Sequence, residues 1–561
     1  MNYRYKVVEL FSGIGSQAKA LQNIGMNIDV VGTCEWNIHA LVAYDAMHNS
    51  TELTPEVQEM SKEEVLDKLK NYTLSGDGKS KLEHEMFRKY PVDSLRRIYQ
   101  AIIRSHNFVD INELTGEKMP FGIDILTYSF PCQDLSNVGA FHGYNLGIDR
   151  DSNSRSSLLW QVGRILKEMK NQNRYLPRYL VMENVPTLLS ERHRGNFQIW
   201  QKELEELGYK SWCFRLNAHD FGLPQNRPRL LMISVKVLND KKRLKLANNF
   251  FDIKTEKMIE DDYKNSDYYK NIQLAELLRT DYTVETYLKE AEESCPNNTP
   301  SRQKIWEENP QLILEGDNKP NPDIDMIRTI TTKQDRNPNS GNLYFKSQYE
   351  GKGDFRYLTP RECLLFMGFT DEDYENIMKN NTYVTKGRPF MSRDKVIRMA
   401  GNSIPVKLLE GVFLQLKNFD GWKMDIHSKE TRSYNMSRIK SKNTKPEETV
   451  RKYLFSKGFR YRKNDKRLPG TPDIVLPKYK TVIFVNGCFW HGHENCRYFV
   501  VPKTNTEFWT NKIETNRKRD IRKKAELEAL GWCIITIWEC QLKPTNVEVT
   551  LNELEYKIRK L

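Results

Sequence analysis

The sequence predicts an α/β fold built as two domains, and three features lead to this expectation. Short apolar runs at 6–11, 28–34 and 122–129 alternate with segments of helical period, which is typical of a parallel sheet covered by helices on both faces. The length of 561 residues exceeds what one hydrophobic core can serve. Residues 425–561 hold 29 basic and 16 acidic residues, so they carry the whole net charge of +13 and indicate a module that binds a polyanion such as nucleic acid.

Changes in composition suggest where the domains begin and end. We expect a first domain over 1–424 and a second over 425–561, joined by a linker near 418–429. Within the first domain, residues 54–106 are charged and of helical period, which predicts an inserted helical segment. Residues about 240–355 are rich in Lys, Asn, Asp and Tyr with weak periodicity, which favours an irregular recognition region over disorder.

Other features exclude whole classes of protein. Nine scattered cysteines do not form a disulfide framework, and the N-terminus lacks the apolar run of a signal peptide. No run approaches eighteen apolar residues, so no membrane span is predicted. We expect a reduced, cytoplasmic, monomeric protein.

A glycine-containing turn, FSGIGS, follows the first apolar run at Phe11 to Ser16. Its glycines let the backbone approach a ligand, and the helix behind it offers free N–H groups, although a lone turn of this kind is weak support. About twenty residues later a predicted strand ends in Glu35 and Trp36, which suit ribose hydroxyls and a purine ring. The spacing predicts a nucleoside cofactor, and the lack of a phosphate-gripping lysine disfavours ATP.

Cys132 is the candidate nucleophile. It stands in SFPCQDLS, in a loop after a predicted strand, where open α/β sheets bind ligands. A lone cysteine is most often an inert core residue, but Glu183 and Asn184 end another apolar run and Arg227 and Arg229 precede a third. Taken singly, these are a structural acid and a solvated surface. Together they are typical of an active site in which neighbouring charges tune a thiol.

These motifs resemble those of DNA cytosine-5 methyltransferases. FSGIGS, PCQDLS, ENV, QNRPRL, TPREC with MGF, and AGNSIPV follow one another in that family's order over most of residues 5–415. The resemblance implies a Rossmann-like domain that acts on duplex DNA, with a target-recognition region at about 240–355 that residues 328–331 close. It also implies S-adenosylmethionine as cofactor, held by Phe11, Gly13, Gly15, Glu35, Trp36, Asp110, Ile111, Asn402 and Ser403.

The same resemblance implies a mechanism. Carbon 5 of cytosine is a poor nucleophile, so the Cys132 thiolate first adds to carbon 6, and carbon 5 then attacks the methyl group. Glu183 donates a proton at N3, Arg229 holds the O2 oxygen and Arg227 orients both. The cytosine must be flipped out of the duplex to reach them. Asp134 departs from the family, which has a small or apolar residue at that position.

The segment FVNGCFWHGHENC in the second domain concentrates metal-binding side chains. Cys488, His493 and Cys496 are spaced C-x4-H-x2-C, and Cys540 follows a later apolar run, a set that suits structural tetrahedral zinc. Burial of all four as core side chains is the alternative. Upstream, Asp473 in LPGTPDIVL begins an apolar run, where a carboxylate suits magnesium at a phosphodiester, although PD alone is usually a turn.

The second domain resembles the Vsr-type very-short-patch mismatch endonucleases over about 425–542. TRSYNMSRIKSKNTKPEE, GTPD, GCFWHGH, TEFW and GWCIITIWEC carry the resemblance. It implies a small restriction-endonuclease-like α/β domain with zinc on Cys488, His493, Cys496 and Cys540, and magnesium on Asp473. His491 and Glu447 would help to polarise water or the leaving oxygen. Three aromatic residues would wedge into DNA beside a mismatch, with ordinary core packing as the alternative: Phe489, Trp490 and Trp509.

The second domain departs from the best-known member of that family in two places. Val485 and Asn486 stand where that enzyme has threonine and histidine, and Glu494 with Asn495 lengthens the zinc loop by one residue. Val485 still offers a main-chain carbonyl. The missing imidazole is a reason to expect slower cleavage.

We therefore expect a bifunctional DNA enzyme of prokaryotic type, associated with the nucleoid. One domain would methylate cytosine, and the other would nick the T:G mismatches that deamination of 5-methylcytosine leaves, at a local concentration raised by the tether. The second domain could instead restrict unmethylated sites, or be a zinc-bound DNA clamp without activity, which the retained Asp473, His491 and Glu447 disfavour. Methylation of RNA is a more distant alternative.

Overall fold

The chain divides into two compact units, Met1–Lys423 and Met424–Leu561. The computed structural model describes residues 3–135, 147–150, 154–238, 240–316, 319–335, 340–379, 381–385, 387–421, 443–494, 496, 499, 506–543 and 546–561, with the side chains of 506–510 left out. Within these residues, none of the helices combines the length and the apolar character that a membrane span requires.

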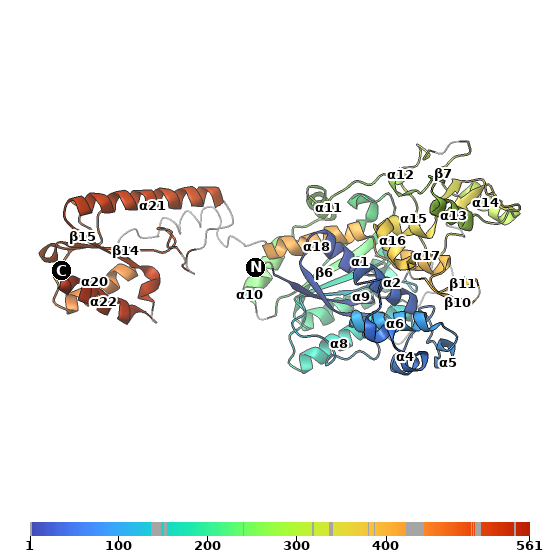
Figure 1. Ribbon diagram of the computed structural model, residues 1–561, viewed down its shortest axis with the longest axis horizontal. Coiled ribbons are helices and arrows are strands. Elements are labelled where there is room, and N and C mark those ends of the chain that lie inside the picture. Colours follow the sequence, from blue (N-terminus) through green and yellow to red (C-terminus); the bar gives the residue numbers. More distant parts are fainter. Residues whose placement is uncertain are drawn as a thin grey trace. The chain divides into compact units, whose positions relative to one another are not determined.

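A six-stranded mixed sheet, in the order β2-β1-β3-β4-β6-β5, forms the centre of the first unit (Figure 1). Its strands are β1 (Tyr5–Leu10), β2 (Ile28–Cys34), β3 (Ile125–Tyr128), β4 (Tyr179–Asn184), β5 (Tyr209–Asn217) and β6 (Pro228–Lys236). The first four pair in parallel, whereas β6 is antiparallel to both β4 and β5. The expected parallel sheet is therefore present in β1 to β4, whereas the pairs that β6 forms with β4 and β5 depart from it. Residues 218–227, which join β5 to β6, are too few for the crossover that a parallel connection needs.

Helices cover both faces of this sheet, as predicted. Successive side chains of β1 belong to different hydrophobic cores, because side chains alternate between the two faces of a strand. Val7 belongs to the core that contains Leu21 and Leu409, and Val8 belongs to the core that contains Leu166 and Trp200. The helices of the first core include α1 (Ser16–Asn23), α2 (Ile38–His48) and α18 (Val406–Gly421), and those of the second are α8 (Leu159–Asn171) and α9 (Glu191–Glu206).

The segment predicted as a helical insertion is helical. It holds α3 (Pro55–Gln58), α4 (Lys62–Leu69), α5 (His84–Phe87) and α6 (Val92–Arg104). Ser61 and Glu64 form a reciprocal cap at the start of α4. The buried side of α6, with Leu95, Ile98 and Ile102, joins the core that includes α2.

The region at 240–355 has more order than the sequence reveals. It contains α10 (Lys241–Phe251), α11 (Glu256–Lys264), α12 (Leu274–Leu277), α13 (Glu285–Ser294), α14 (Pro300–Glu308) and a sheet of β7 (Gln311–Ile313), β8 (Asn342–Tyr344) and β9 (Phe355–Tyr357). Its first helices pack on α18, where the rings of Phe250 and Phe419 lie 5.5 Å apart. The chain then forms α15 (Pro360–Leu365), α16 (Asp371–Met378), β10 (Tyr383–Thr385), β11 (Arg388–Pro389) and α17 (Arg393–Asn402).

The second unit is a smaller α/β layer structure. Its sheet has the order β12-β13-β14-β15, in which only the β14–β15 pair is parallel: β12 (Arg462–Lys463), β13 (Ile474–Leu476), β14 (Thr481–Asn486) and β15 (Cys533–Trp538). Ile474 and Ile483 pack on one face with α20 (Lys445–Ser456) and α22 (Val547–Lys560). Val475 and Val482 pack on the other with Leu527 of α21 (Thr506–Ala529).

Candidate active sites

The turn between β1 and α1 has a backbone that favours glycine. Phe11, Gly13 and Gly15 all have positive φ, at 57°, 53° and 81°. At Gly15 a Cβ atom would also lie 2.7 Å from Cε2 of Tyr44. The sequence therefore needs glycine at this point for α1 to begin close to β1.

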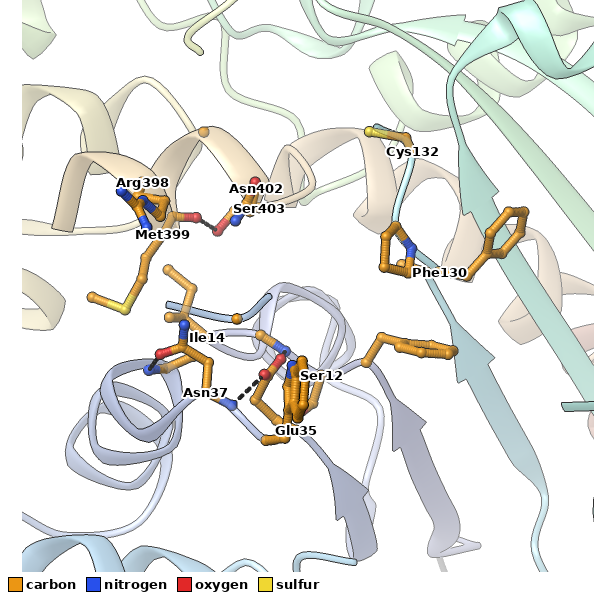
Figure 2. A pocket seen from close by; sticks show the side chains of 18 of the residues that line it. Ser12, Ile14, Glu35, Asn37, Phe130, Cys132, Arg398, Met399, Asn402 and Ser403 are labelled. Atoms are coloured by element: carbon orange, nitrogen blue, oxygen red, sulfur yellow. Dashed lines mark hydrogen bonds between the residues drawn. The ribbon is translucent and has the colours of Figure 1, made fainter. Parts of the chain in front are cut away.

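Glu35 fixes this turn from the end of β2. One carboxylate oxygen accepts a hydrogen bond from the Gly13 N–H at 3.1 Å, and the other accepts one from the Asn37 N–H at 2.8 Å (Figure 2). Burial raises the pKa of Glu35, and the backbone N–H donors oppose that rise. Each oxygen keeps lone-pair capacity, so the carboxylate can also accept bonds from ligand hydroxyls.

A cavity of about 340 Å³ brings the two predicted sites of the first unit together. With the exception of Gly15, every residue predicted to bind the cofactor lines it, and so does every residue predicted to act on cytosine: Phe11, Gly13, Glu35, Trp36, Asp110, Ile111, Asn402, Ser403, Cys132, Glu183, Arg227 and Arg229. Figure 2 shows Glu35 beside the glycine turn and Cys132 on a separate loop further along the cavity. A ligand bound at the turn can therefore reach a group held beside the thiol.

Cys132, Glu183 and Arg229 come from three neighbouring parts of the sheet. Cys132 follows β3, Glu183 lies in β4, and Arg229 lies in β6, which pairs with β4. The Arg229 Nε donates to the Glu183 carboxylate at 2.8 Å. Burial raises the pKa of the Cys132 thiol; the Arg229 guanidinium opposes that rise, whereas the Glu183 carboxylate adds to it. Burial likewise raises the pKa of Glu183, against the effect of Arg229.

Arg227 binds main-chain atoms instead of other charged groups. Its guanidinium donates to the carbonyl oxygens of Ile330, Gly401 and Ser403 at 2.6 to 2.8 Å, and the side chain is 1% exposed. These bonds tie the residue before β6 to Ile330 of the recognition region and to the end of α17. Arg227 thus shapes the wall of the cavity on which Asn402 and Ser403 lie.

Arg155 is a residue that the motifs did not reveal. From the start of a 3-10 turn (Arg155–Leu158), it donates to the Gln133 side chain at 2.6 Å and to the Gly78 carbonyl oxygen. Gly78 belongs to the inserted segment, whose residues 76–79 line the cavity. The loop after the candidate nucleophile is therefore fastened to the insertion. A basic residue 23 positions after a cysteine has no sequence signal of its own.

In the second unit, Asp473 lies directly before β13. Its Oδ2 accepts a hydrogen bond from the Val485 N–H at 2.8 Å, which places the carboxylate at the junction of β13 and β14. Burial raises the pKa of Asp473 to about 6, and the nearby Glu447 carboxylate adds to the rise. A cation would relieve both effects, so this carboxylate suits an oxygen-binding ion such as magnesium.

Glu447 lies in the first turn of α20, where its carboxylate caps the helix. It accepts hydrogen bonds from the N–H groups of Asn443 and Thr444 and from the Thr444 hydroxyl. It also pairs with Arg451 at 2.6 Å, and both side chains are buried. Its role as a capping and pairing group was not foreseen from the sequence.

His491 pairs with a residue that the sequence did not suggest. Its Nδ1 is hydrogen-bonded to the Asp520 carboxylate, which comes from the middle of α21. A carboxylate on one ring nitrogen fixes the tautomer and leaves the other nitrogen to accept a proton. Twenty-nine residues separate the two side chains, and no motif connects them.

Four further residues of the second unit form a cluster with the spacing of a metal site. The ligand atoms of Cys488, His493, Cys496 and Cys540 all lie within 4.8 Å of one another. The His493 Nδ1 is 3.6 Å from the Cys488 sulfur and 3.4 Å from the Cys540 sulfur. Tetrahedral zinc places sulfur and nitrogen ligands about 3.5 Å apart, given its usual bond lengths. The His493 ring also stacks on Trp538 at 4.0 Å, which orients it.

Two of the three predicted wedge residues lie side by side. Phe489 and Trp490 are half-buried, with ring centroids 5.2 Å apart, and the Trp490 carbonyl oxygen accepts a bond from Asn516. The side chain of Trp509 and the whole of Asn495 are outside the described residues.

Comparison with known proteins identifies both units. Residues 86–418 match the family of C-5 cytosine-specific DNA methylases, and residues 424–497 match the DNA mismatch endonuclease Vsr. The chain belongs to the C-5 cytosine-specific DNA methylase family and carries a Vsr mismatch endonuclease at its C-terminus. It is thus a DNA cytosine-5 methyltransferase and a DNA mismatch endonuclease in one polypeptide, which confirms the resemblances found in the sequence.

Individual relatives match one unit each. The orphan methyltransferase M.SssI of Spiroplasma monobiae is 32% identical over 428 residues, which cover 73% of this chain and 96% of that protein. The type II nicking enzyme V.NmeAIP of Neisseria meningitidis is 52% identical over 137 residues, covering 24% of this chain and 96% of that enzyme. The DNA mismatch endonuclease Vsr of Escherichia coli is 45% identical over 119 residues, covering 21% of this chain and 76% of that enzyme.

Proposed function

We propose that the first unit transfers a methyl group from S-adenosylmethionine to carbon 5 of a cytosine in a specific site of duplex DNA. The observation that carries this proposal is the single cavity that holds both the glycine turn with Glu35 and the group of Cys132, Glu183 and Arg229. Bound at the turn, the cofactor supplies a methyl group on a sulfonium centre. Trp36 suits its adenine ring, and Glu35 suits its ribose hydroxyls.

The protein's own residues prepare the ring for methylation. The Cys132 thiol loses its proton and adds to carbon 6, a step that Arg229 favours because it stabilises the thiolate. Glu183, whose raised pKa favours the protonated form, donates a proton to N3 as negative charge develops on the ring. Carbon 5 then takes up the methyl group. Loss of the proton at carbon 5 afterwards restores the double bond and expels the Cys132 thiolate from carbon 6, while the proton on N3 returns to Glu183.

The test traps the bond between sulfur and the ring. Fluorine at carbon 5 cannot be removed as a proton, so duplexes with 5-fluorocytosine should retain the enzyme covalently in the presence of S-adenosylmethionine. The adduct should survive denaturing electrophoresis, and Cys132→Ser should abolish both the adduct and methyl transfer. Bisulfite sequencing first locates the target site. Methyl transfer by Cys132→Ser at the normal rate would refute the assignment.

We propose further that the second unit nicks one strand at T:G mismatches with magnesium. Asp473 would hold the ion at the scissile phosphate, while His491, oriented by Asp520, takes a proton from the attacking water. Zinc on Cys488, His493, Cys496 and Cys540 would fix the loop that presents His491. The relatives described as nicking enzymes and as a mismatch endonuclease support nicking over double-strand restriction.

A comparison of three duplexes tests this second activity. With magnesium, the enzyme should nick a T:G duplex of the target sequence and leave the methylated and unmethylated C:G duplexes intact. Asp473→Ala should abolish nicking without changing methyl transfer. Cutting of both strands of the unmethylated duplex would show a restriction enzyme instead.

A further inference from the structure

Arg451 of α20 contacts several residues of the proposed nuclease site, although no motif in the sequence points to it. Its Nη2 donates to the Glu447 carboxylate at 2.6 Å and to the main-chain oxygen of Asp473 at 3.2 Å, and its Nη1 donates to the Asn443 side chain at 2.7 Å. The side chain is only 6% exposed. One planar guanidinium therefore joins the start of α20 to the residue directly before β13.

The carboxylate that Arg451 holds has no capacity left for another partner. Glu447 accepts from the Asn443 N–H, the Thr444 N–H, the Thr444 hydroxyl and Arg451, whereas an ionised carboxylate has about four lone-pair sites. Asn443 itself has a positive φ of 55°, a conformation that these bonds help to maintain. Glu447 is thus committed to the protein and is not free to bind an ion or a water molecule.

We infer that Arg451 is a positioning residue of the nuclease, and that Glu447 works through it and not on the metal or the water. Arg451 and Glu447 together hold the main chain at Asp473. The Asp473 carboxylate can then accept the hydrogen bond of the Val485 N–H and face the scissile phosphate. This inference rests on the proposed nicking activity and changes the role expected for Glu447. A fixed guanidinium suits this task, because its fork geometry restricts three partners at once.

The inference makes a distinct kinetic prediction. Arg451→Ala should lower the nicking rate at saturating magnesium by about 10- to 100-fold, the usual effect of removing a group that orients a metal ligand. The magnesium concentration at half-maximal rate should stay the same or fall, because a neighbouring positive charge has been removed. Arg451→Lys, which keeps the charge without the fork, should give an intermediate rate.

Matched controls separate positioning from stability. Arg559→Ala removes an arginine of the same unit that is 55% exposed and pairs with Glu555, and it should nick like the original chain. Methyl transfer by the first unit should be unchanged in all variants. If thermal melting shows that Arg451→Ala does not fold, Arg451→Lys takes its place, and a full nicking rate in either folded variant would overturn the inference.

Magnesium binding gives a second readout that does not depend on catalysis. Isothermal titration of the full chain with magnesium chloride should show equal or tighter binding in Arg451→Ala. Loss of magnesium binding, or recovery of the normal rate at high magnesium, would overturn the inference, because Arg451 would then act on metal affinity. Failure of the unaltered chain to nick T:G duplexes would refute the proposed activity instead, and the titration would still decide the role of Arg451.

Discussion

The Cys132 thiol lies between two groups that move its pKa in opposite directions. Arg229 favours the thiolate and Glu183 favours the thiol, while Arg229 is itself bound to Glu183. Burial raises the pKa of both the nucleophile and the proton donor, and this ion pair also shifts both values. Catalysis needs the thiolate together with the carboxylic acid, so burial favours the required form of Glu183 and disfavours that of Cys132.

This arrangement predicts opposite shifts in the pKa of Cys132 for two substitutions. Arg229→Gln should raise it, because the cation that stabilises the thiolate is lost, so alkylation by iodoacetamide should require a higher pH. Glu183→Gln should lower it, because the nearby negative charge is lost, so alkylation should extend to lower pH. Mass spectrometry of the peptide that contains Cys132 measures the alkylation at each pH.

The exposed residue Arg215 on β5 provides the control for this pair. Arg215→Gln keeps the change of charge but lies outside the group around Cys132, and it should leave the alkylation profile unchanged. Shifts of the same sign for Arg229→Gln and Glu183→Gln would contradict the arrangement. Such a result would mean that burial alone sets the pKa of the thiol.

The elements that carry these residues differ in how far the sequence predicts them. The ends of strands can be predicted from the sequence, because an apolar run followed by polar residues marks the edge of a sheet. In this way β3 ends shortly before Cys132, and Glu183 lies near the end of β4. Side chains that contact a site from a distant part of the chain cannot be predicted in this way. Asp520 and Arg155 reach their sites only through tertiary packing, and each looks like one charged residue among many. Arg451 is four residues from Glu447, but its bond to the Asp473 main chain also depends on tertiary packing.

The direction of strands and the packing of the variable region were also beyond the sequence. The antiparallel pairing of β6 follows from a short connection whose ends the sequence did not mark. The helices α10 and α11 looked like part of an irregular region, yet Phe250 and Ile259 belong to the core that contains α18. Apolar residues do recur at helical spacing in both helices, but the composition of the whole region, rich in Lys, Asn, Asp and Tyr, obscured that period.

The insertion and the loop after Cys132 should move together, because Arg155 fastens one to the other. We expect Arg155→Met to speed amide hydrogen exchange at residues 76–80 by about tenfold, since a charge-assisted hydrogen bond contributes about 1.5 kcal/mol or more. The Michaelis constant for S-adenosylmethionine should rise, because residues 76–79 line the cavity. Lys170→Met on α8 is the control, as its amine bonds only the distant Glu206 carbonyl among the contacts described. Unchanged exchange at 76–80 would show that the insertion is held by its own bonds.

The two units have separate hydrophobic cores, so a substitution that destabilises one unit need not destabilise the other. The clusters around β1 and β4 contain only residues of the first unit, and those around β13 and β14 contain only residues of the second. The whole net positive charge also lies in the second unit. Phosphate binding by the nuclease should therefore be more sensitive to salt than phosphate binding by the methyltransferase.

This independence can be tested at the proposed zinc site, where bound zinc would contribute stability to a unit with a small core. We expect Cys540→Ser to reduce the zinc content of the purified chain and to lower the melting temperature of the second unit by about 10 °C or more, because bound structural zinc stabilises the fold. T:G nicking should be lost, while methyl transfer and the melting of the first unit stay unchanged. Cys533→Ser is the matched control, because Cys533 lies on the adjacent strand β15 but outside the cluster. If Cys540→Ser lowered methyl transfer as much as nicking, the stability of the first unit would have to depend on the folding of the second.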